Sequence, residues 1–306
     1  MNTLKKFLLD ATGFRQEAKK HVKKYWLASP IGIIGLVLTF TAHAQDPAHL
    51  SRHSSEAEAK VFQAAGANAS SIQSSVDQFR VTLGGANNGN APGPLASGRR
   101  EINWDGGGNN RSTSVSGNPL TTFLVTRGSL YTTPDGTGFV QAPPAADPAQ
   151  FPPGGLAGLF NNLTYGTIFS TFSDLRLFSA IGSNITEVDF FVPGGGNIPA
   201  TVTGFGAVFT DVDQPDGSGP GNKHGNRKAS TLIEYYGADG ELLFSSFVPA
   251  SPGDGSLSFF GIVFEDARIA RVRITSGNVA PGPDDEGKRD VVMMDDFIYG
   301  EPQPLP

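Results

Sequence analysis

Apolar and polar residues alternate along much of this chain, with the period of two that half-buried β-strands show. The two clearest examples are residues 185–192 and residues 268–274. In both segments the apolar side chains share one face, and the charged side chains on the opposite face are Glu187, Asp189, Arg271 and Arg273. This pattern predicts strands with one face in the core and the other in solvent.

Strand-like runs recur from residue 100 onward, and Gly/Pro-rich breakers separate them. The runs are residues 100–104, 121–126, 138–141, 167–172, 175–181, 185–192, 201–210, 231–236, 242–248, 257–264, 269–274 and 291–299. Strands do not alternate with helical segments, so a parallel α/β sheet is not expected. The sequence therefore predicts an all-β fold, an antiparallel β-sandwich or jelly roll.

One helical pattern precedes these strands. Its apolar residues recur at the spacing of one helix face and are Ile72, Val76, Phe79 and Leu83. Ser70 or Ser71 is the expected N-cap, and two glycines follow the pattern. We predict a short amphipathic helix over residues 70–83 that packs on the sandwich edge, with partner binding as the alternative use.

The predicted sandwich domain covers residues 70–301. Before it, residues 45–69 read as a polar, Ala/Ser-rich leader with some helical tendency. After it, residues 302–306 form a Pro-rich tail with no hydrophobic segment. Two Pro/Gly-rich insertions, residues 142–160 and 214–229, are expected to be surface loops.

Residues 1–44 read as an export signal. A lysine-rich region comes first, an apolar stretch follows at residues 31–40, and the segment ends in Ala42-His43-Ala44. This order is typical of a signal peptide, here cleaved before Gln45. An uncleaved anchor is the alternative, but the apolar stretch is short for a membrane span, which needs about 20 residues. The predicted location is secreted, extracellular or periplasmic.

The charge of the chain argues against a nucleic-acid partner. The whole chain has a formal net charge of −6, and its first 44 residues hold seven Lys/Arg and two Asp/Glu, which leaves −11 for the rest. Such a surface repels a phosphate backbone. The chain has no cysteine, which excludes disulfides and thiol catalysis, while 22 phenylalanines supply a large core.

Two acidic pairs occur at the ends of aromatic strand patterns. Asp211 and Asp213 end one strand, and Asp295 and Asp296 lie in the last one. Neighbouring residues on a strand point to opposite faces, so one member of the second pair should face the core. A carboxylate on an apolar face needs a cation or several donors. We therefore predict a structural calcium ion held by these four aspartates, with Glu301 as a further candidate.

The calcium hypothesis has an alternative. The stretch from Asp211 to Gly217 does not match an EF-hand, because its third acid comes one position late. The aspartates could instead accept backbone hydrogen bonds at strand ends. They could also pair with nearby arginines, of which the candidates are Arg271, Arg273 and Arg289.

A further constellation is Glu101-Ile-Asn-Trp104-Asp. If Trp104 were exposed beside these polar groups, it could stack on a sugar ring, so Trp104 and Glu101 are candidate ligand-binding residues. A tryptophan within a β domain more often fills the core because of its large area.

Support for an enzyme is small. After the predicted cleavage, the remaining histidines are His49, His53 and His224, which lie in the leader or in a Gly-rich loop. A Ser-His-Asp triad or a histidine zinc site therefore has no placed histidine. A glycosidase needs two carboxylates, and Glu101, Glu187 or Glu234 could serve, although no spacing selects a pair.

Three segments carry a resemblance to known proteins. They are residues 79–106, residues 204–213 with Gly-Phe-Gly-Ala-Val-Phe-Thr-Asp-Val-Asp, and residues 290–302 with Met-Met-Asp-Asp-Phe-Ile-Tyr-Gly-Glu-Pro. They resemble a poorly characterised group of bacterial exported β-sandwich proteins related to PEP-CTERM-type passenger proteins. The resemblance implies export and a sandwich, and it implies no particular activity. Some members carry a C-terminal tag with a membrane span, from which this chain departs.

The leading hypothesis is an exported, non-catalytic β-sandwich that binds extracellular polysaccharide or a surface matrix and holds a calcium ion. One alternative is a carbohydrate-active enzyme with a carboxylate pair. Another is a purely structural extracellular matrix protein.

Overall fold

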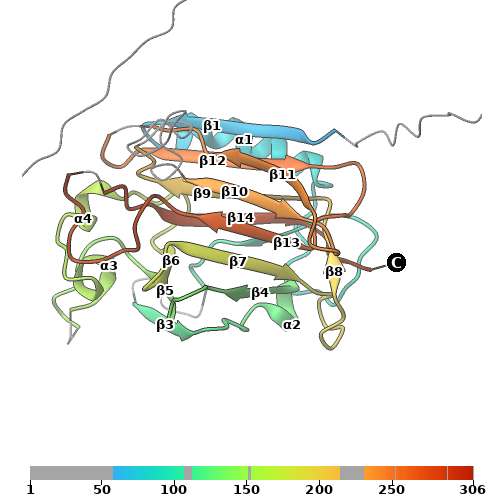
Figure 1. Cartoon of the computed structure of the whole chain (residues 1–306), viewed down its shortest axis with the longest axis horizontal. Coiled ribbons are helices and arrows are strands. Elements are labelled where there is room, and N and C mark those ends of the chain that lie inside the picture. Colours follow the sequence, from blue (N-terminus) through green and yellow to red (C-terminus); the bar gives the residue numbers. More distant parts are fainter. Residues whose placement is uncertain are drawn as a thin grey trace, which may run out of the picture. The chain divides into compact units, whose positions relative to one another are not determined.

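Strands make up most of the regular structure of this chain (Figure 1). The computed structural model describes residues 58–106, 112–150, 153–213, 231–251, 253–287 and 289–305. The predicted signal peptide, the first part of the predicted leader and the insertion at 214–229 lie outside the described residues. Within them, two antiparallel sheets pack face to face, so the predicted β-sandwich is confirmed.

Sheet A is the larger sheet, with eight strands. Its path runs β1-β12-β9-β14-β6-β5-β3, and β2 pairs with β14 beside that path. The strands are β1 (Lys60–Gly66), β2 (Arg99–Ile102), β3 (Ser114–Gly117), β5 (Gly138–Ala142), β6 (Leu177–Ile181), β9 (Gly204–Thr210), β12 (Leu257–Val263) and β14 (Met293–Gly300).

Sheet B has five strands in the order β11-β10-β13-β7-β4. They are β4 (Ser129–Thr132), β7 (Ile185–Phe190), β10 (Leu232–Tyr236), β11 (Leu242–Phe247) and β13 (Arg271–Thr275). A two-stranded ribbon joins β8 (Ala200–Thr201) to β15 (Gln303–Pro304). Residues of the predicted tail therefore pair with the body of the domain.

The described helices are α1 (Ala69–Thr82), α2 (Leu124–Arg127), α3 (Gly155–Leu159) and α4 (Tyr165–Ile168). Helix α1 matches the predicted amphipathic helix, but its N-cap is Asn68, whose Oδ1 accepts the N–H of Ser71 at 3.2 Å. No strand forms at the predicted residues 121–126 and 167–172: α2 overlaps the end of the first segment and α4 the start of the second. Runs this short do not let periodicity separate strand from helix. None of the helices formed by the described residues is long and apolar enough to span a membrane.

The main core fills the space between the two sheets. Sheet A contributes residues such as Phe205, Phe209 and Ile262, and sheet B contributes Val188 and Ile274, all fully buried. Figure 1 shows the strands of both sheets running in similar directions, with α3 and α4 at one end and α2 and β8 at the other. Such aligned packing lets the inner side chains of both sheets interdigitate.

The outer faces of the two sheets differ. Helix α1 covers part of sheet A through Val76 and Phe79, and α3 and α4 cover another part through Leu156 and Tyr165. Consequently every residue of β9, β12 and β14 is buried. Along β7, β10 and β13, by contrast, buried residues alternate with partly or fully exposed ones. Sheet B therefore presents an open face to solvent.

The predicted leader, residues 45–69, is wrong in its second half, because residues 60–66 form strand β1 of the sandwich. Residues 60–66 pair antiparallel with β12, which places Phe62 opposite Gly261. Phe62 packs edge-on against Phe79 of α1, with ring centroids 5.5 Å apart. The sandwich therefore begins before residue 70. Phe62 is the strand's one fully buried residue, so the sequence shows no alternation there.

Strand β14 contains a β-bulge at the second acidic pair. Its pairing register with β9 shifts by one residue between Met294 and Phe297. Asp295 and Asp296 therefore share one partner across the strand, Val208. Both carboxylates approach the same serine hydroxyl, so they lie side by side. The expectation that they point to opposite faces is wrong, because it assumed an unbroken strand.

Candidate functional site

The four aspartates predicted as calcium ligands lie in two places. Asp211 and Asp213 directly follow β9, whereas Asp295 and Asp296 occupy the bulge within β14. The charges that act most strongly on Asp211 are those of Asp213 and Asp290, not those of the bulge pair. Among the described residues, no three Asp, Glu or His side chains are grouped so that they could hold a metal ion. The predicted convergence of the four aspartates is therefore corrected.

The bulge pair is a buried carboxylate dyad. Asp295 Oδ2 accepts the N–H of Phe172 at 2.6 Å and Oδ1 accepts the Ser173 hydroxyl at 3.1 Å, while Asp296 pairs with Arg80 of α1 at 3.2 Å. Burial and the adjacent Asp296 raise the pKa of Asp295 well above its usual range, and burial raises the pKa of Asp296. Asp296 Oδ1 has no hydrogen-bond donor. A proton on Asp295 supplies that donor, so the two carboxylates titrate as one unit.

This dyad does not suit glycoside hydrolysis. The two carboxyl groups of a glycosidase stand about 5 Å apart or more, with the sugar between them. Asp295 and Asp296 are in mutual hydrogen-bond reach, and their exposed fractions are 0% and 3%. Glu101 is ion-paired with Arg80 at 3.0 Å and with Arg99, which ties β2 to α1. These carboxylates connect the bulge and β2 to α1 and to the segment at Phe172 through ion pairs and hydrogen bonds.

Trp104 belongs to the core. Its ring stacks on Phe178 with a distance of 3.7 Å between ring centroids. Its Nε1 donates a hydrogen bond of 3.0 Å to the backbone carbonyl of Asp295, which lies in the bulge. With an exposed fraction of 1%, it presents no face to a sugar. The ligand-binding alternative for Trp104 is therefore corrected.

Glu301, the further candidate calcium ligand, forms an ion pair with Arg100. Its two carboxylate oxygens accept from Arg100 Nη2 at 2.6 Å and from Arg100 Nε at 2.7 Å, and both side chains are buried. Such a two-pronged pair is strong and geometrically fixed. It holds the start of β2 against the end of β14 and leaves Glu301 unsuited to bind a metal.

The carboxylates after β9 have a different environment. Asp211 and Asp290 are buried, and neither they nor Asp213 has an ion-pair partner among the described residues. Both carboxylate oxygens of Asp290 lack a hydrogen-bond donor; only the backbone N–H of Asp213 approaches them, outside hydrogen-bond geometry. Burial and the charge of Asp213 raise the pKa of Asp211 to about 8 and that of Asp290 to about 7.

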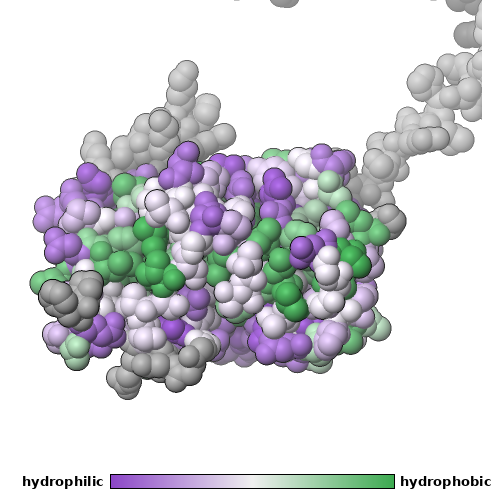
Figure 2. Space-filling model, turned by 90° about the horizontal axis from the view of Figure 1, so that it is seen from below, coloured by the Kyte–Doolittle hydropathy of each residue, from purple (hydrophilic) through white to green (hydrophobic). Residues whose placement is uncertain are grey.

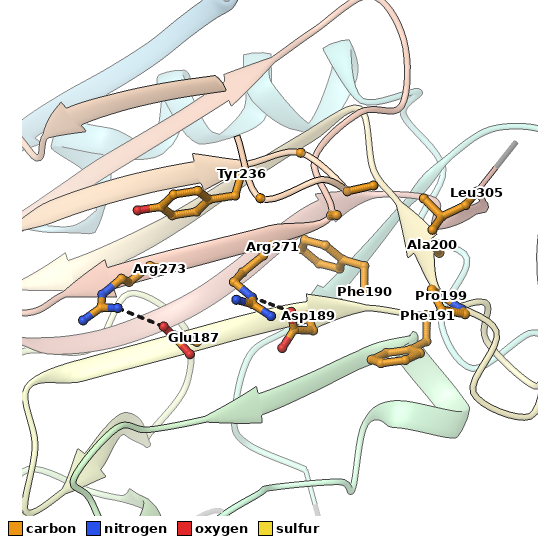
Figure 3. A pocket seen from close by; sticks show the side chains of 14 residues that line it. Glu187, Asp189, Phe190, Phe191, Pro199, Ala200, Tyr236, Arg271, Arg273 and Leu305 are labelled. Atoms are coloured by element: carbon orange, nitrogen blue, oxygen red, sulfur yellow. Dashed lines mark hydrogen bonds and ion pairs between the residues drawn. The ribbon is translucent and has the colours of Figure 1, made fainter. Parts of the chain in front are cut away.

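The open face of sheet B carries a hollow of about 570 Å³. Arg273 pairs with Glu187 at 3.1 Å, and Arg271 pairs with Asp189 at 2.7 Å (Figure 3). Tyr236 lies directly opposite Arg271 on the neighbouring strand, so its ring extends this polar row. The fold thus sets an aromatic ring beside two planar guanidinium–carboxylate pairs on a rigid surface.

Loops border this hollow. The turn at residues 237–240 contributes to its lining, and Phe191, Pro199 and Leu305 lie together on another side (Figure 3). The ribbon of β8 and β15 holds the last two of these near the sheet. The hollow therefore has a flat polar floor and partly apolar borders, a combination that suits a ligand with both hydroxyl groups and an apolar face.

Other surfaces give weaker candidates. A groove between α1 and β1 is lined by polar side chains such as Gln73 and Asp77, with exposed Val81. Figure 2, which looks onto the edge where β3 and β4 lie, shows apolar patches between polar residues. Exposed apolar residues such as Val115 are ordinary on globular surfaces.

Tyr236 and Asp290 are not among the site residues predicted from the sequence. Alternation within residues 231–236 places Tyr236 on the outer face, so a signal for it exists. Asp290 has no such signal. Asp290 precedes β14, which pairs with β9, and its charge acts on Asp211 only in the folded chain.

Comparisons of the chain with protein-family models, with curated proteins and with solved structures found no match. The resemblance to exported β-sandwich proteins remains a prediction.

Proposed function

We propose that this protein is an exported, non-catalytic β-sandwich that binds an extracellular polysaccharide in the hollow on sheet B. The observation that carries the proposal is the row formed by Asp189, Arg271 and Tyr236 on an open, rigid sheet face. Aromatic side chains offer a large apolar area with a polar tip, which suits the apolar face of a sugar ring. Guanidinium and carboxylate groups supply donors and acceptors for its hydroxyls.

The charges of the hollow favour an uncharged polysaccharide. Arg271 and Arg273 face Asp189 and Glu187 one to one, and Glu234 lies across from Arg273 on β10. The local charge is therefore close to balanced and slightly negative, so an acidic polymer gains no net attraction. Binding to a neutral polymer should change little between about 0.1 and 1 M salt, where the Debye length falls from about 10 to 3 Å.

The test is a glycan array followed by calorimetric titration of each polysaccharide that binds. Tyr236→Ala should weaken binding at least about tenfold, which corresponds to about 1.4 kcal/mol. Arg271→Ala should weaken it as well. Phe247→Ala is the matched control, because Phe247 is a partly exposed aromatic residue of the same sheet that does not line the hollow.

Four outcomes would contradict the proposal. If no glycan binds, or if Tyr236→Ala and Phe247→Ala weaken binding equally, the hollow is not the site. Release of reducing sugar that Glu187→Gln abolishes would indicate the enzyme. Each carboxylate in the hollow faces an arginine rather than the apolar pocket that keeps a general acid protonated, so we expect no turnover. Self-association without glycan binding would indicate a matrix protein.

A further inference from the structure

We propose that the hollow on sheet B is one part of a longer groove, and that the groove binds a linear, neutral polysaccharide with a flat, ribbon-like chain, such as a β-1,4-linked one. A second hollow of about 370 Å³ adjoins the first, because Gly237, Ala238 and Leu305 line both. This ligand class rests on the proposed function, since the first hollow has to bind polysaccharide before the second can extend the site.

The two hollows follow one another along the open side of sheet B. Figure 3 shows Arg273, Arg271 and Leu305 in this order across the first hollow. Leu305 also lines the second hollow, which extends to Asp266 and Arg268. The groove therefore runs from the Arg273 end of the first hollow, past Leu305, into the second.

One hydrogen-bonded segment connects the floors of the two hollows. Arg268 lies three positions before Arg271, and the N–H of Ala270 between them donates to the carbonyl of Tyr236 at 2.9 Å. An extended chain covers at most about 17 Å over residues 268–273. This length exceeds that of a single sugar ring, so a ligand that fills the groove has several linked rings.

The second hollow repeats the chemistry of the first. Arg268 Nε donates to Asp266 Oδ1 at 2.7 Å, and the guanidinium carbon lies 5.1 Å from the ring centroid of Phe264. These two contacts hold the guanidinium and leave it further N–H groups for sugar hydroxyls. Leu305, with an exposed fraction of 39%, adds an apolar surface. Each hollow thus offers an arginine–carboxylate pair beside an apolar surface, which matches a polymer of repeating rings.

The charge of the second hollow favours a neutral polymer over an acidic one. Asp239 and Glu241 line it, and neither has an ion-pair partner in the part of the chain that the structure describes. Arg268, the basic residue of this hollow, is already paired with Asp266. A chain of uronic acids would bring its carboxylates toward these acids, and like charges repel.

The flat floor of the first hollow favours an extended chain. The floor is the face of a sheet, and the ring of Tyr236 lies beside its ion pairs (Figure 3). An aromatic ring packs well on the apolar face of a sugar ring. Chains with two equatorial linkages per ring form flat ribbons that present these faces repeatedly, whereas α-1,4-linked chains coil and curve away from a flat floor.

The experiment is calorimetric titration of the purified chain with β-1,4-linked glucose and mannose oligosaccharides, from the disaccharide to the hexasaccharide. At least one series should bind, and its affinity should rise about tenfold or more from the shortest to the longest member. Two matched probes test shape and charge, namely α-1,4-linked glucose and β-1,4-linked mannuronate hexasaccharides. Each should bind at least about tenfold more weakly than its β-1,4-linked neutral counterpart.

Arg268→Ala separates the second hollow from the first. It should weaken hexasaccharide binding about fivefold or more and leave disaccharide binding within about twofold, because only the longer ligand reaches Arg268. Tyr236→Ala should weaken both. Arg289→Ala is the matched control, since Arg289 also pairs with an aspartate at the surface, at 3.1 Å, but lines neither hollow.

If Arg268→Ala does not fold, Leu305→Ala carries the same test and should weaken the hexasaccharide more than the disaccharide. Its control is Leu242→Ala, which removes another exposed leucine that lines neither hollow.

The failures of the groove and of the proposed function are distinguishable. If no glycan of any kind binds, both fail. The groove alone is refuted if a glycan binds in a Tyr236-dependent way but affinity does not rise with length, or if the second-hollow variant behaves like its control. It is also refuted if the α-1,4-linked or mannuronate probe binds as tightly as the neutral ribbon.

Discussion

At the scale of single residues, the buried acids of this protein are stabilised in different ways. Glu301 has a fixed arginine partner, so its charge is neutralised within the fold. Asp295 has no arginine of its own and relies on backbone and hydroxyl donors and on a proton shared with Asp296. Burial and the neighbouring Asp296 therefore favour the protonated form of Asp295 in the folded state. This difference gives stability a pH dependence that belongs to the pair of Asp295 and Asp296.

Asp295→Asn should reduce the pH dependence of stability. The folded-state pKa of Asp295 is raised above the unfolded value of about 3.9, so its contribution is full below that value and is lost as pH rises through the folded pKa. Asparagine mimics the protonated acid at every pH, since its amide N–H₂ donates toward Asp296. The variant should therefore gain stability relative to the unsubstituted chain as pH rises from about 4 to 8.

Urea unfolding at several pH values measures this difference, with Asp284→Asn as an exposed control. A difference in unfolding free energy that does not change with pH would show that Asp295 is not protonated in the folded state.

The sequence predicts residue positions well where alternation is unbroken. Glu187, Asp189, Arg271 and Arg273 are on the predicted solvent face. It fails at Asp295 and Asp296, because an inserted residue in β14 changes which way their side chains point. No local sequence pattern predicts that insertion in the segment Val-Val-Met-Met-Asp-Asp-Phe. The effect of Asp290 on Asp211 depends on which strands become neighbours, a property of the whole sheet.

At the scale of elements, α1 packs on sheet A through an aromatic ring that contacts two glycines of the sheet. The ring of Phe79 lies over Gly206 of β9 and Gly261 of β12, and these glycines lie opposite each other. An added methyl group at Gly206 would stand 2.9 Å from the ring of Phe79 and 3.1 Å from the Cα of Gly261. Neither neighbour is the end of a flexible chain. Glycine at this point therefore makes the close approach of the helix possible.

Gly206→Ala should destabilise the domain by about 1–3 kcal/mol, the usual cost of overpacking a filled core. Gly117→Ala, a strand glycine with open space around it, is the control and should stay within about 0.5 kcal/mol of the unsubstituted chain. Denaturant unfolding gives both values. Equal effects at the two positions would show that α1 is not closely packed on this patch.

Sequence patterns predict α1 and the sheet B strands β7, β10, β11 and β13, because most of them have an apolar face of their own. They miss β1, whose single buried residue, Phe62, gives no period, and they miss the four-residue strands β3 and β4. They also read α2 and α4 as strands. Elements whose burial depends on one residue or one turn are defined by their neighbours in space, and periodicity does not report these neighbours.

At the scale of the whole molecule, one core joins both sheets. Trp104 contacts Phe178 of sheet A at 3.7 Å and Tyr131 of sheet B at 5.5 Å between ring centroids. The cluster between the sheets draws on nearly every strand. Neither sheet can separate without exposing this aromatic centre, so the two sheets should unfold together.

Unfolding of the domain should therefore give a single transition. Near-ultraviolet circular dichroism, which reports the aromatic core, and far-ultraviolet circular dichroism, which reports the strands, should give the same midpoint in urea. Separate midpoints would show that one sheet survives without the other.

The bulge in β14 also has a consequence for how the chain length can vary in related proteins. Met294 and Phe297 both point into the main core, although they are three positions apart in a strand whose faces alternate every second residue. The extra residue between them, at the bulge, lets both side chains point to the same face of the sheet. A related protein that lacks either Asp295 or Asp296 would keep both halves of the strand in phase with the core. A deletion elsewhere in β14 would turn half of the strand over. The aspartate pair therefore marks a position in this strand at which evolution can remove a residue and keep the core.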